Sequence, residues 1–152
     1  MKDMEMRNVR NAKKRSGFTL VEIMVVVVII GLLAGIIGPQ IINHLEEARR
    51  TTARAQIRVF EEALTMYHMR NGFFPTTLQG LNALVTRPTS PPIPRHFPPG
   101  GFLTYIPLDP WGNPYIFRNP GTRPPFDIIS TGRTGEEGGE GFDADITNHD
   151  RM

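Results

Sequence analysis

Residues that could do chemistry gather first in a short run, residues 17–22, which opens a long apolar segment. Glu22 is the only ionisable side chain between residues 18 and 38. A carboxylate at membrane depth costs about 2.5–3.5 kcal/mol, so we expect it to have a function and a partner. If the chain is cut after Gly17, the new amine on Phe18 lies one helical turn from Glu22, and the amine of a neighbouring copy could pair with it. The alternative is that Glu22 lies near the membrane interface, protonated or snorkelling, with no specific role.

The apolar segment, residues 18–38, has the length of a membrane span. Its 21 residues would form a helix of about 31 Å, close to the thickness of a bilayer core. The leader, residues 1–17, carries six basic and two acidic residues, and the positive-inside rule keeps it cytoplasmic. From residue 18 onward 11 basic and 13 acidic residues remain, a formal net charge of −2. The pI of 9.3 therefore does not indicate a nucleic-acid partner.

Two ordinary kinds of export signal fit this N-terminus less well. A secretory signal is cut after its apolar region at a site of the A-x-A kind. The candidate here, at Ala34, lacks the small residue two positions earlier, because Leu32 stands there. An uncleaved signal anchor would explain the charge and the hydrophobicity, but it gives no reason for Glu22.

Residues 15–24, with the sequence RSGFTLVEIM, resemble the processing site of type IV pilins and type II secretion pseudopilins. In that family a prepilin peptidase cuts after the glycine on the cytoplasmic side and methylates the new amine. The resemblance implies processing at Gly17 and Phe18, with the apolar helix retained. It also implies that Glu22, the fifth residue of the mature protein, acts in assembly.

The helix is expected to continue through residues 39–71 as an amphipathic segment. Apolar and small residues recur there at steps of three or four, which indicates one apolar stripe: Ile41, Leu45, Ala48, Thr52, Ala55, Val59, Ala63 and Met66. Asn71-Gly72 supplies a stop. Pro39 should kink the helix, and the alternative is a separate second helix after a break at Gly38-Pro39.

Residues 72–152 are expected to form one small domain. Thr76 and Thr77 could cap a short helix that ends near Val85, and prolines exclude regular structure from about 87 to 100. Three strands are predicted, at about 102–106, 114–118 and 126–130, with a turn at 109–114 joining the first two. So small a sheet is marginal alone, so it should pack against the long helix. The fold class is α+β with a small antiparallel sheet.

More of this domain is similar to the major pseudopilins of type II secretion, the G subunits. The similar segments are residues 67–84, the stretch DPWGNPY at 109–115, and DIIS at 127–130. The resemblance implies a type IV pilin-like fold with a Pro-rich connecting loop. Adhesive type IV pilins usually close a C-terminal loop with a disulfide, and this chain has no cysteine, which favours a pseudopilin.

The segment from residue 131 to 150 offers the second candidate site. Carboxylates and glycines alternate there, a pattern that suits calcium but is not an EF-hand. The resemblance implies Asp143 and Asp145 as side-chain ligands, with carbonyl oxygens from Thr131 and Gly139. Thr134 stands where the family has an aspartate, which would weaken binding, and His149 stands where tryptophan is common. The alternative is a solvated acidic loop without an ion.

No catalytic constellation is readable. The four histidines lack ligand spacing, and no P-loop or Gly-x-Ser-x-Gly motif is present, so we expect a protein that is not an enzyme. The sequence predicts a single-pass inner-membrane subunit with a periplasmic domain. It would polymerise with itself and act with minor pseudopilins, the peptidase and N-methyltransferase, and the inner-membrane assembly platform. A type IV pilin for adhesion or motility and a periplasmic binding module on an uncleaved anchor are the alternatives.

Overall fold

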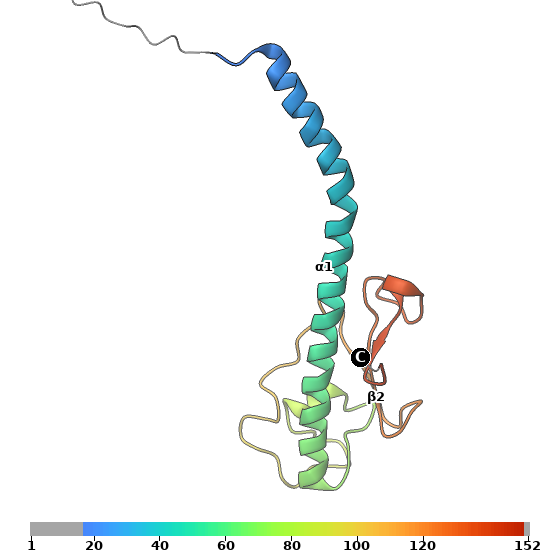
Figure 1. The fold of residues 1–152 in the computed structure, drawn as a ribbon. Helices are drawn as coiled ribbons and strands as arrows, with labels where there is room; N and C mark the ends of the chain where they lie inside the picture. The colour runs from blue at the N-terminus through green and yellow to red at the C-terminus, as the bar shows by residue number, and fades with distance from the viewer. Residues whose placement is uncertain (1–16, 151–152) are drawn as a thin grey trace, which may run out of the picture. The chain divides into compact units, whose positions relative to one another are not determined.

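A computed structural model describes residues 17–150, with all their side chains except those of residues 37–41. Figure 1 shows a long helix, α1 (Leu20–Asn71), followed by short elements. These are η1 (Leu81–Leu84), β1 (Ile116–Arg118), β2 (Asp127–Ser130), η2 (Gly141–Asp143) and β3 (Ile146–Thr147). The chain forms two compact units that divide between Ile41 and Ile42. Residues 1–16 of the leader lie outside the described residues.

α1 runs across the division between the two units as a single helix of 52 residues. The alternative of two helices broken at Gly38-Pro39 is therefore wrong. The kink expected at Pro39 concerns the orientation of the two units and stays a prediction. The stop at Asn71-Gly72 is confirmed, because Gly72 has φ 83° and its N–H donates to His68 O at 2.7 Å. A glycine in this left-handed conformation is a common way to end a helix.

The first unit consists of the N-terminal part of α1. Every described side chain from Phe18 to Ile36 is exposed, including Phe18 at 81% and Leu32 at 66%. None of the helices, as far as they are described, combines the length and the hydropathy needed to cross a membrane. The membrane span predicted for residues 18–38 therefore stays a prediction.

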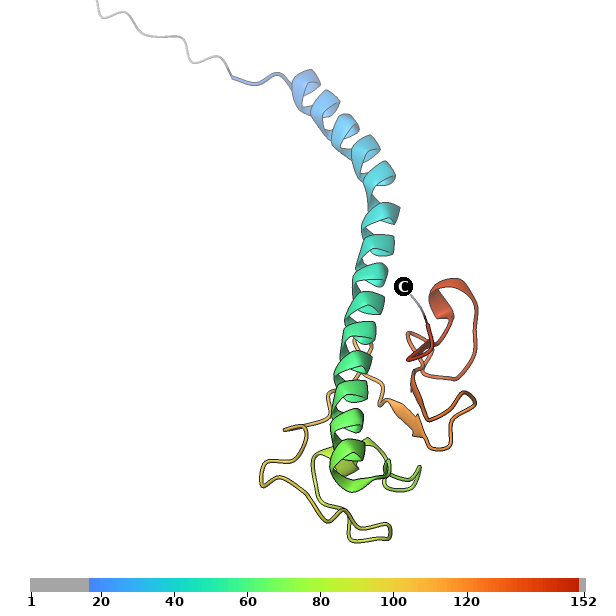
Figure 2. The same cartoon turned by 60° about the horizontal axis from the view of Figure 1, so that its bottom comes forward.

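The second unit has its core against the C-terminal half of α1. Six residues of the helix face it, each 4% exposed or less: Ala53, Ile57, Phe60, Ala63, Leu64 and Tyr67. Their spacing of three and four residues places them in one stripe. The other side of the core comes mainly from the strands and their flanks, from Tyr115, Phe117, Phe126, Ile128 and Ile146. Figures 1 and 2 show the sheet beside this half of α1.

The apolar stripe predicted for this half of α1 lies mostly on the face of the helix that the sheet does not cover. Ala63 is buried, but Leu45, Val59 and Met66 are 48–52% exposed. The helix carries apolar residues on two faces, and the sheet covers the face with the larger rings. The rings of Phe60 and Tyr115 pack edge to face with their centroids 5.0 Å apart, and the centroids of Tyr67 and Phe102 are 5.2 Å apart. Aromatic area outweighs the regular spacing of the smaller residues.

The sheet is antiparallel, in the order β1-β2-β3. The predicted strands at 114–118 and 126–130 are confirmed in shortened form as β1 and β2. The strand predicted at 102–106 is wrong, because Phe102 and Leu103 donate their N–H groups to Leu84 O rather than to a neighbouring strand. β3 was not predicted, since it lies among the acidic and polar residues of the C-terminal segment.

The region between α1 and the sheet agrees with the sequence in outline. A short helix is present as η1, although Thr76 caps the turn before it: the Gln79 N–H donates to Thr76 Oγ1 at 3.2 Å. Residues 87–100 contain no helix or strand, as their prolines predict. The turn at 109–114 forms around Asp109, whose Oδ1 accepts the Asn113 N–H at 2.8 Å.

Candidate functional site

The start of α1 is held by a reciprocal pair of side chains. The Glu22 N–H donates to Thr19 Oγ1 at 3.2 Å, and the Thr19 N–H donates to Glu22 Oε2 at 3.3 Å. This is a capping box, in which a threonine and a glutamate three positions later satisfy free N–H groups at a helix start. This capping box was not predicted from the sequence, although the spacing Thr-x-x-Glu is typical of one. Glu22 therefore has a role within its own chain.

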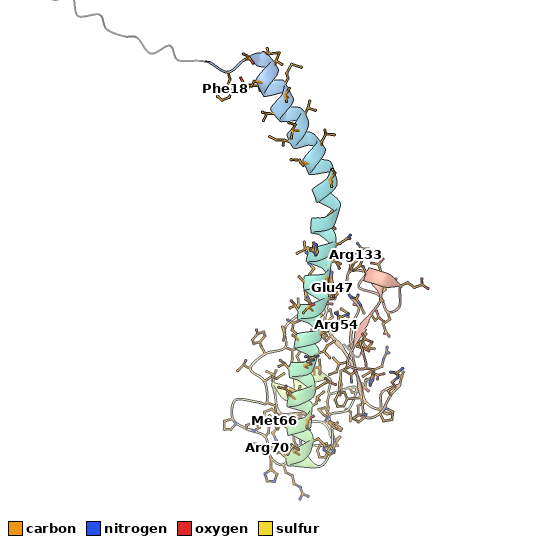
Figure 3. The ribbon with its side chains drawn as sticks, viewed as in Figure 1. Phe18, Glu47, Arg54, Met66, Arg70 and Arg133 are labelled. Carbon is orange, nitrogen blue, oxygen red and sulfur yellow. The ribbon has the colours of Figure 1, made fainter. Side chains whose placement is uncertain are left out.

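The candidate cleavage point lies just before this cap. Phe18 is exposed and is labelled at the start of α1 in Figure 3. A Cβ added to Gly17 would meet nothing within 4 Å. The fold therefore does not itself require a glycine at this position, and any requirement must come from a partner that approaches the backbone.

The second candidate site is the loop of residues 131–145, here called the acidic loop. Thr134 Oγ1 is within hydrogen-bond distance of two carbonyl oxygens, Thr131 O at 3.1 Å and Glu136 O at 3.0 Å. The Gly138 N–H donates to Asp145 Oδ2 at 2.9 Å. Asp145 Oδ1 is buried and has no hydrogen-bond partner among the described residues. Thr134 thus contacts Thr131, whereas the Asp145 carboxylate contacts the backbone of Gly138, and the expectation that these residues share one ion stays a prediction.

Two arginines hold the other side of the acidic loop. Arg133 Nε and Nη2 donate to Asp143 Oδ1 at 3.0 and 2.6 Å. Arg50, which is buried in α1, donates from Nη1 to Phe142 O at 3.3 Å and Ala144 O at 2.9 Å. Gly139 approaches this segment so closely that a Cβ there would overlap Asp143 O. Sequence reasoning missed both arginines, because neither one lies in a recognisable motif.

Calcium suits this oxygen-rich loop in part. Among the described residues, no group of three or more His, Cys, Asp or Glu side chains could hold a metal. A site here would depend on carbonyl and hydroxyl oxygens beside the carboxylates, which calcium accepts. The unpartnered Asp145 Oδ1 is the observation that fits a cation, because a buried carboxylate oxygen is costly without a partner. Asp145, Thr131, Thr134 and Asp143 would hold the ion, with the Gly139 carbonyl as an expected fifth donor.

The acidic loop lies between β2 and β3, and its first residues are held by the turn at 109–114. Ser130 Oγ, at the end of β2, donates to Asp109 Oδ2 at 2.7 Å, and Asn113 Nδ2 donates to Gly132 O at 2.7 Å. The Asp109 turn is joined to α1 by Trp111, whose Nε1 donates to Glu46 Oε1 at 2.6 Å. Buried polar groups in a satisfied network of this kind fix one geometry.

A buried carboxylate, Asp127, lies at the start of β2. Burial alone would raise the pKa of Asp127, but hydrogen bonds from Thr122, His149 and Arg123 outweigh it and lower the pKa to about 2. His149 Nε2 lies 2.6 Å from Asp127 Oδ1. His149, which stands where the resemblance expects tryptophan, thus joins the C-terminal end to β2.

A long helix with a capped, apolar first half and a small antiparallel sheet packed on its second half defines the class of the type IV pilin-like subunits. The chain matches the prokaryotic N-terminal methylation motif over residues 12–38. It matches the family described as type II secretion system, protein G, over residues 40–149. The second match covers more than half of the chain, so the chain belongs to the type II secretion protein G family.

Individual relatives agree with this membership. The chain is 49% identical to the type II secretion system core protein G of Pseudomonas aeruginosa, over 91% of this chain and 97% of that one. It is 46% identical to the core protein G of Vibrio cholerae, over 91% and 94%. The crystal structure of the major pseudopilin from enterohaemorrhagic Escherichia coli superposes with a TM-score of 0.64 at 38% identity, covering 70% of this chain and 91% of that one. The protein is a structural subunit of the pseudopilus, as its relatives are, and the expected lack of enzymatic activity stays a prediction.

Proposed function

We propose that this subunit is made as a precursor whose basic leader stays in the cytoplasm while residues 18–38 cross the inner membrane. A prepilin peptidase then cuts after Gly17 and methylates Phe18, and the mature chain polymerises with its domain in the periplasm. The observation that supports this most is the contrast at the start of α1, where an exposed apolar surface carries one carboxylate. The match of residues 12–38 to the methylation motif agrees with it.

Glu22 serves two bonds in this scheme. Both contacts of its carboxylate with Thr19 end on Oε2. Oε1 is therefore the oxygen that the Phe18 amine of a neighbouring copy can approach. The pair would neutralise two charges in an apolar surrounding, where each charge alone has a high energetic cost. Each new subunit would therefore stop in the register at which its neighbour's amine meets Glu22.

The second half of α1 also leaves surface for other copies. Leu45, Val59 and Met66 remain about half exposed at intervals that place them along one face. Helices of the filament would pack through this face and through the apolar first half. Minor pseudopilins and the inner-membrane assembly platform are the other expected partners, since a filament of one subunit needs a start and an assembly machine.

Substitutions at Glu22 test the role of the charge. Glu22→Leu removes the cap and the charge, whereas Glu22→Gln keeps an oxygen that accepts the Thr19 N–H and loses only the charge. We expect both variants to insert and to be cleaved, and both to fail to form filaments when sheared fractions are pelleted and blotted. Filaments at the wild-type level from Glu22→Gln would show that Glu22 acts only as a helix cap and would contradict the registering role.

We further propose that the acidic loop binds calcium through Asp145, Asp143 and the oxygens of Thr131 and Thr134, with Gly139 adding its carbonyl. The ion would supply positive charge that ties the two sides of the loop together. Because Thr134 replaces a carboxylate, binding should be weaker than in a site with a full carboxylate set. An ion that binds only the folded state raises the melting temperature as its concentration rises. An unchanged melting temperature between chelator and millimolar calcium would contradict this proposal.

A further inference from the structure

The acidic loop already contains a cation of its own. Figure 3 labels Arg133, which lies on this loop and places two nitrogens on one carboxylate oxygen of Asp143. Both bonds end on the same oxygen, so the pair is a charge-assisted contact between two partly exposed side chains. Asp143 is also one of the two carboxylates in the proposed calcium site, so Arg133 and the ion would share one carboxylate.

We propose that Arg133 competes with calcium for Asp143, so that this chain keeps its acidic loop closed when calcium is scarce and binds the ion weakly. The inference rests on the proposed calcium binding. Arginine and calcium repel each other at contact distance, and calcium must therefore displace Arg133 before it gains the Asp143 oxygen. Removal of Arg133 makes calcium bind more tightly.

The other arginines near the loop do not compete in this way. Arg50 donates to the carbonyl oxygens of Phe142 and Ala144 and is only 8% exposed, so it anchors the backbone on α1. Arg118 pairs with Glu137, which is outside the proposed ligand set. Arg133 differs from both, because its partner is a proposed ligand and its side chain is 58% exposed. It is therefore free to leave when an ion arrives.

The competition predicts opposite effects with and without calcium. In chelator, Arg133→Ala leaves the Asp143 carboxylate without its partner, and the amides of residues 138–145 should exchange hydrogen faster than in the wild type. With calcium, the same variant lacks the competitor, and the dissociation constant should fall on the order of tenfold, as expected for removal of a charge a few ångströms from a divalent ion. A role limited to packing would give faster exchange in both conditions.

The experiment uses the full chain in detergent, with calcium titrations by calorimetry and with hydrogen exchange. Arg133→Lys keeps the charge without the two guanidinium bonds, and its calcium dissociation constant should lie between those of wild type and Arg133→Ala. Arg54→Ala is the matched control, because Arg54 also pairs with a glutamate, Glu47, at 3.5 Å on the surface of α1. Circular dichroism checks that each variant is folded.

The outcomes separate the two proposals. Tighter calcium binding by Arg133→Ala with no change in Arg54→Ala supports the competition, as does binding by Arg133→Ala alone. Equal dissociation constants for Arg133→Ala and the wild type overturn the competition and leave the calcium site standing. No binding by either protein at millimolar calcium overturns the calcium site and the competition with it.

Discussion

The two halves of α1 have the same secondary structure and opposite surroundings. From Leu20 to Ile36 every side chain is exposed, whereas from Ala53 to Tyr67 one face of the helix is buried against the sheet. The second half thus finds its apolar partners within the chain, and the first half does not. Exposed apolar surface of this extent marks a site of contact with a membrane or with other proteins. A single helix therefore packs on its own domain at one end and leaves apolar surface exposed at the other.

The largest expected effect comes from matched truncations in the two halves. Phe60→Ala removes a ring that is 1% exposed and packed on Tyr115, and should lower the free energy of unfolding by about 3–5 kcal/mol. Ile30→Ala, at a position 59% exposed, should change it by less than about 0.5 kcal/mol. Trp111 is the only tryptophan and contacts Glu46 of α1, so its fluorescence in guanidinium reports on this unit. Equal losses in both variants would break the comparison.

A smaller effect is expected from Asp127, the buried carboxylate at the start of β2. The pKa of Asp127 is lowered to about 2 from 3.8, so the ionised group stabilises the fold above pH 4, and that contribution is lost as the pH falls from about 4 to 2. Asp127→Asn should cost about 1–2 kcal/mol at pH 7. It should also flatten the loss of stability in acid. Free energies of unfolding at pH 7, 4 and 2.5 that fall equally with pH in wild type and variant would contradict this.

The smallest effect on folding is expected at the exposed face of the second half. Val59→Ser and Met66→Ser should each change the free energy of unfolding by less than about 0.5 kcal/mol, since both side chains are about half exposed. The double variant should nevertheless yield fewer filaments than wild type. A normal filament yield with unchanged stability would show that this face does not take part in assembly.

The sequence predicted the elements better than their faces. α1, its stop at Gly72, β1, β2 and the Pro-rich connection follow from local signals. The apolar stripe read from the sequence did not show which face of α1 the sheet covers, because both faces carry apolar residues and only the positions of Tyr115 and Phe102 decide between them. The strand at 102–106 failed because a single carbonyl, that of Leu84, takes its N–H groups.

The candidate sites divide in the same way. Thr131 and Thr134, which lie close in sequence, are joined by a hydrogen bond, while a shared ion site with Asp145 stays a prediction. The contact of Arg50 with the acidic loop joins residues more than 90 positions apart, and no local pattern reveals it. Arg133 lies only ten residues from Asp143, but its pairing depends on how the glycines turn the chain.

The N-terminus of the protein in its membrane tests the central claim most directly. The account predicts that intact-mass and peptide spectra of the chain purified from membranes begin at Phe18, with the added mass of one methyl group on its amine. Gly17→Val should then accumulate as the uncut precursor, because a peptidase beside a helix needs close approach to the backbone. A wild-type chain that begins at Met1, or at a residue after the apolar segment, would contradict the account.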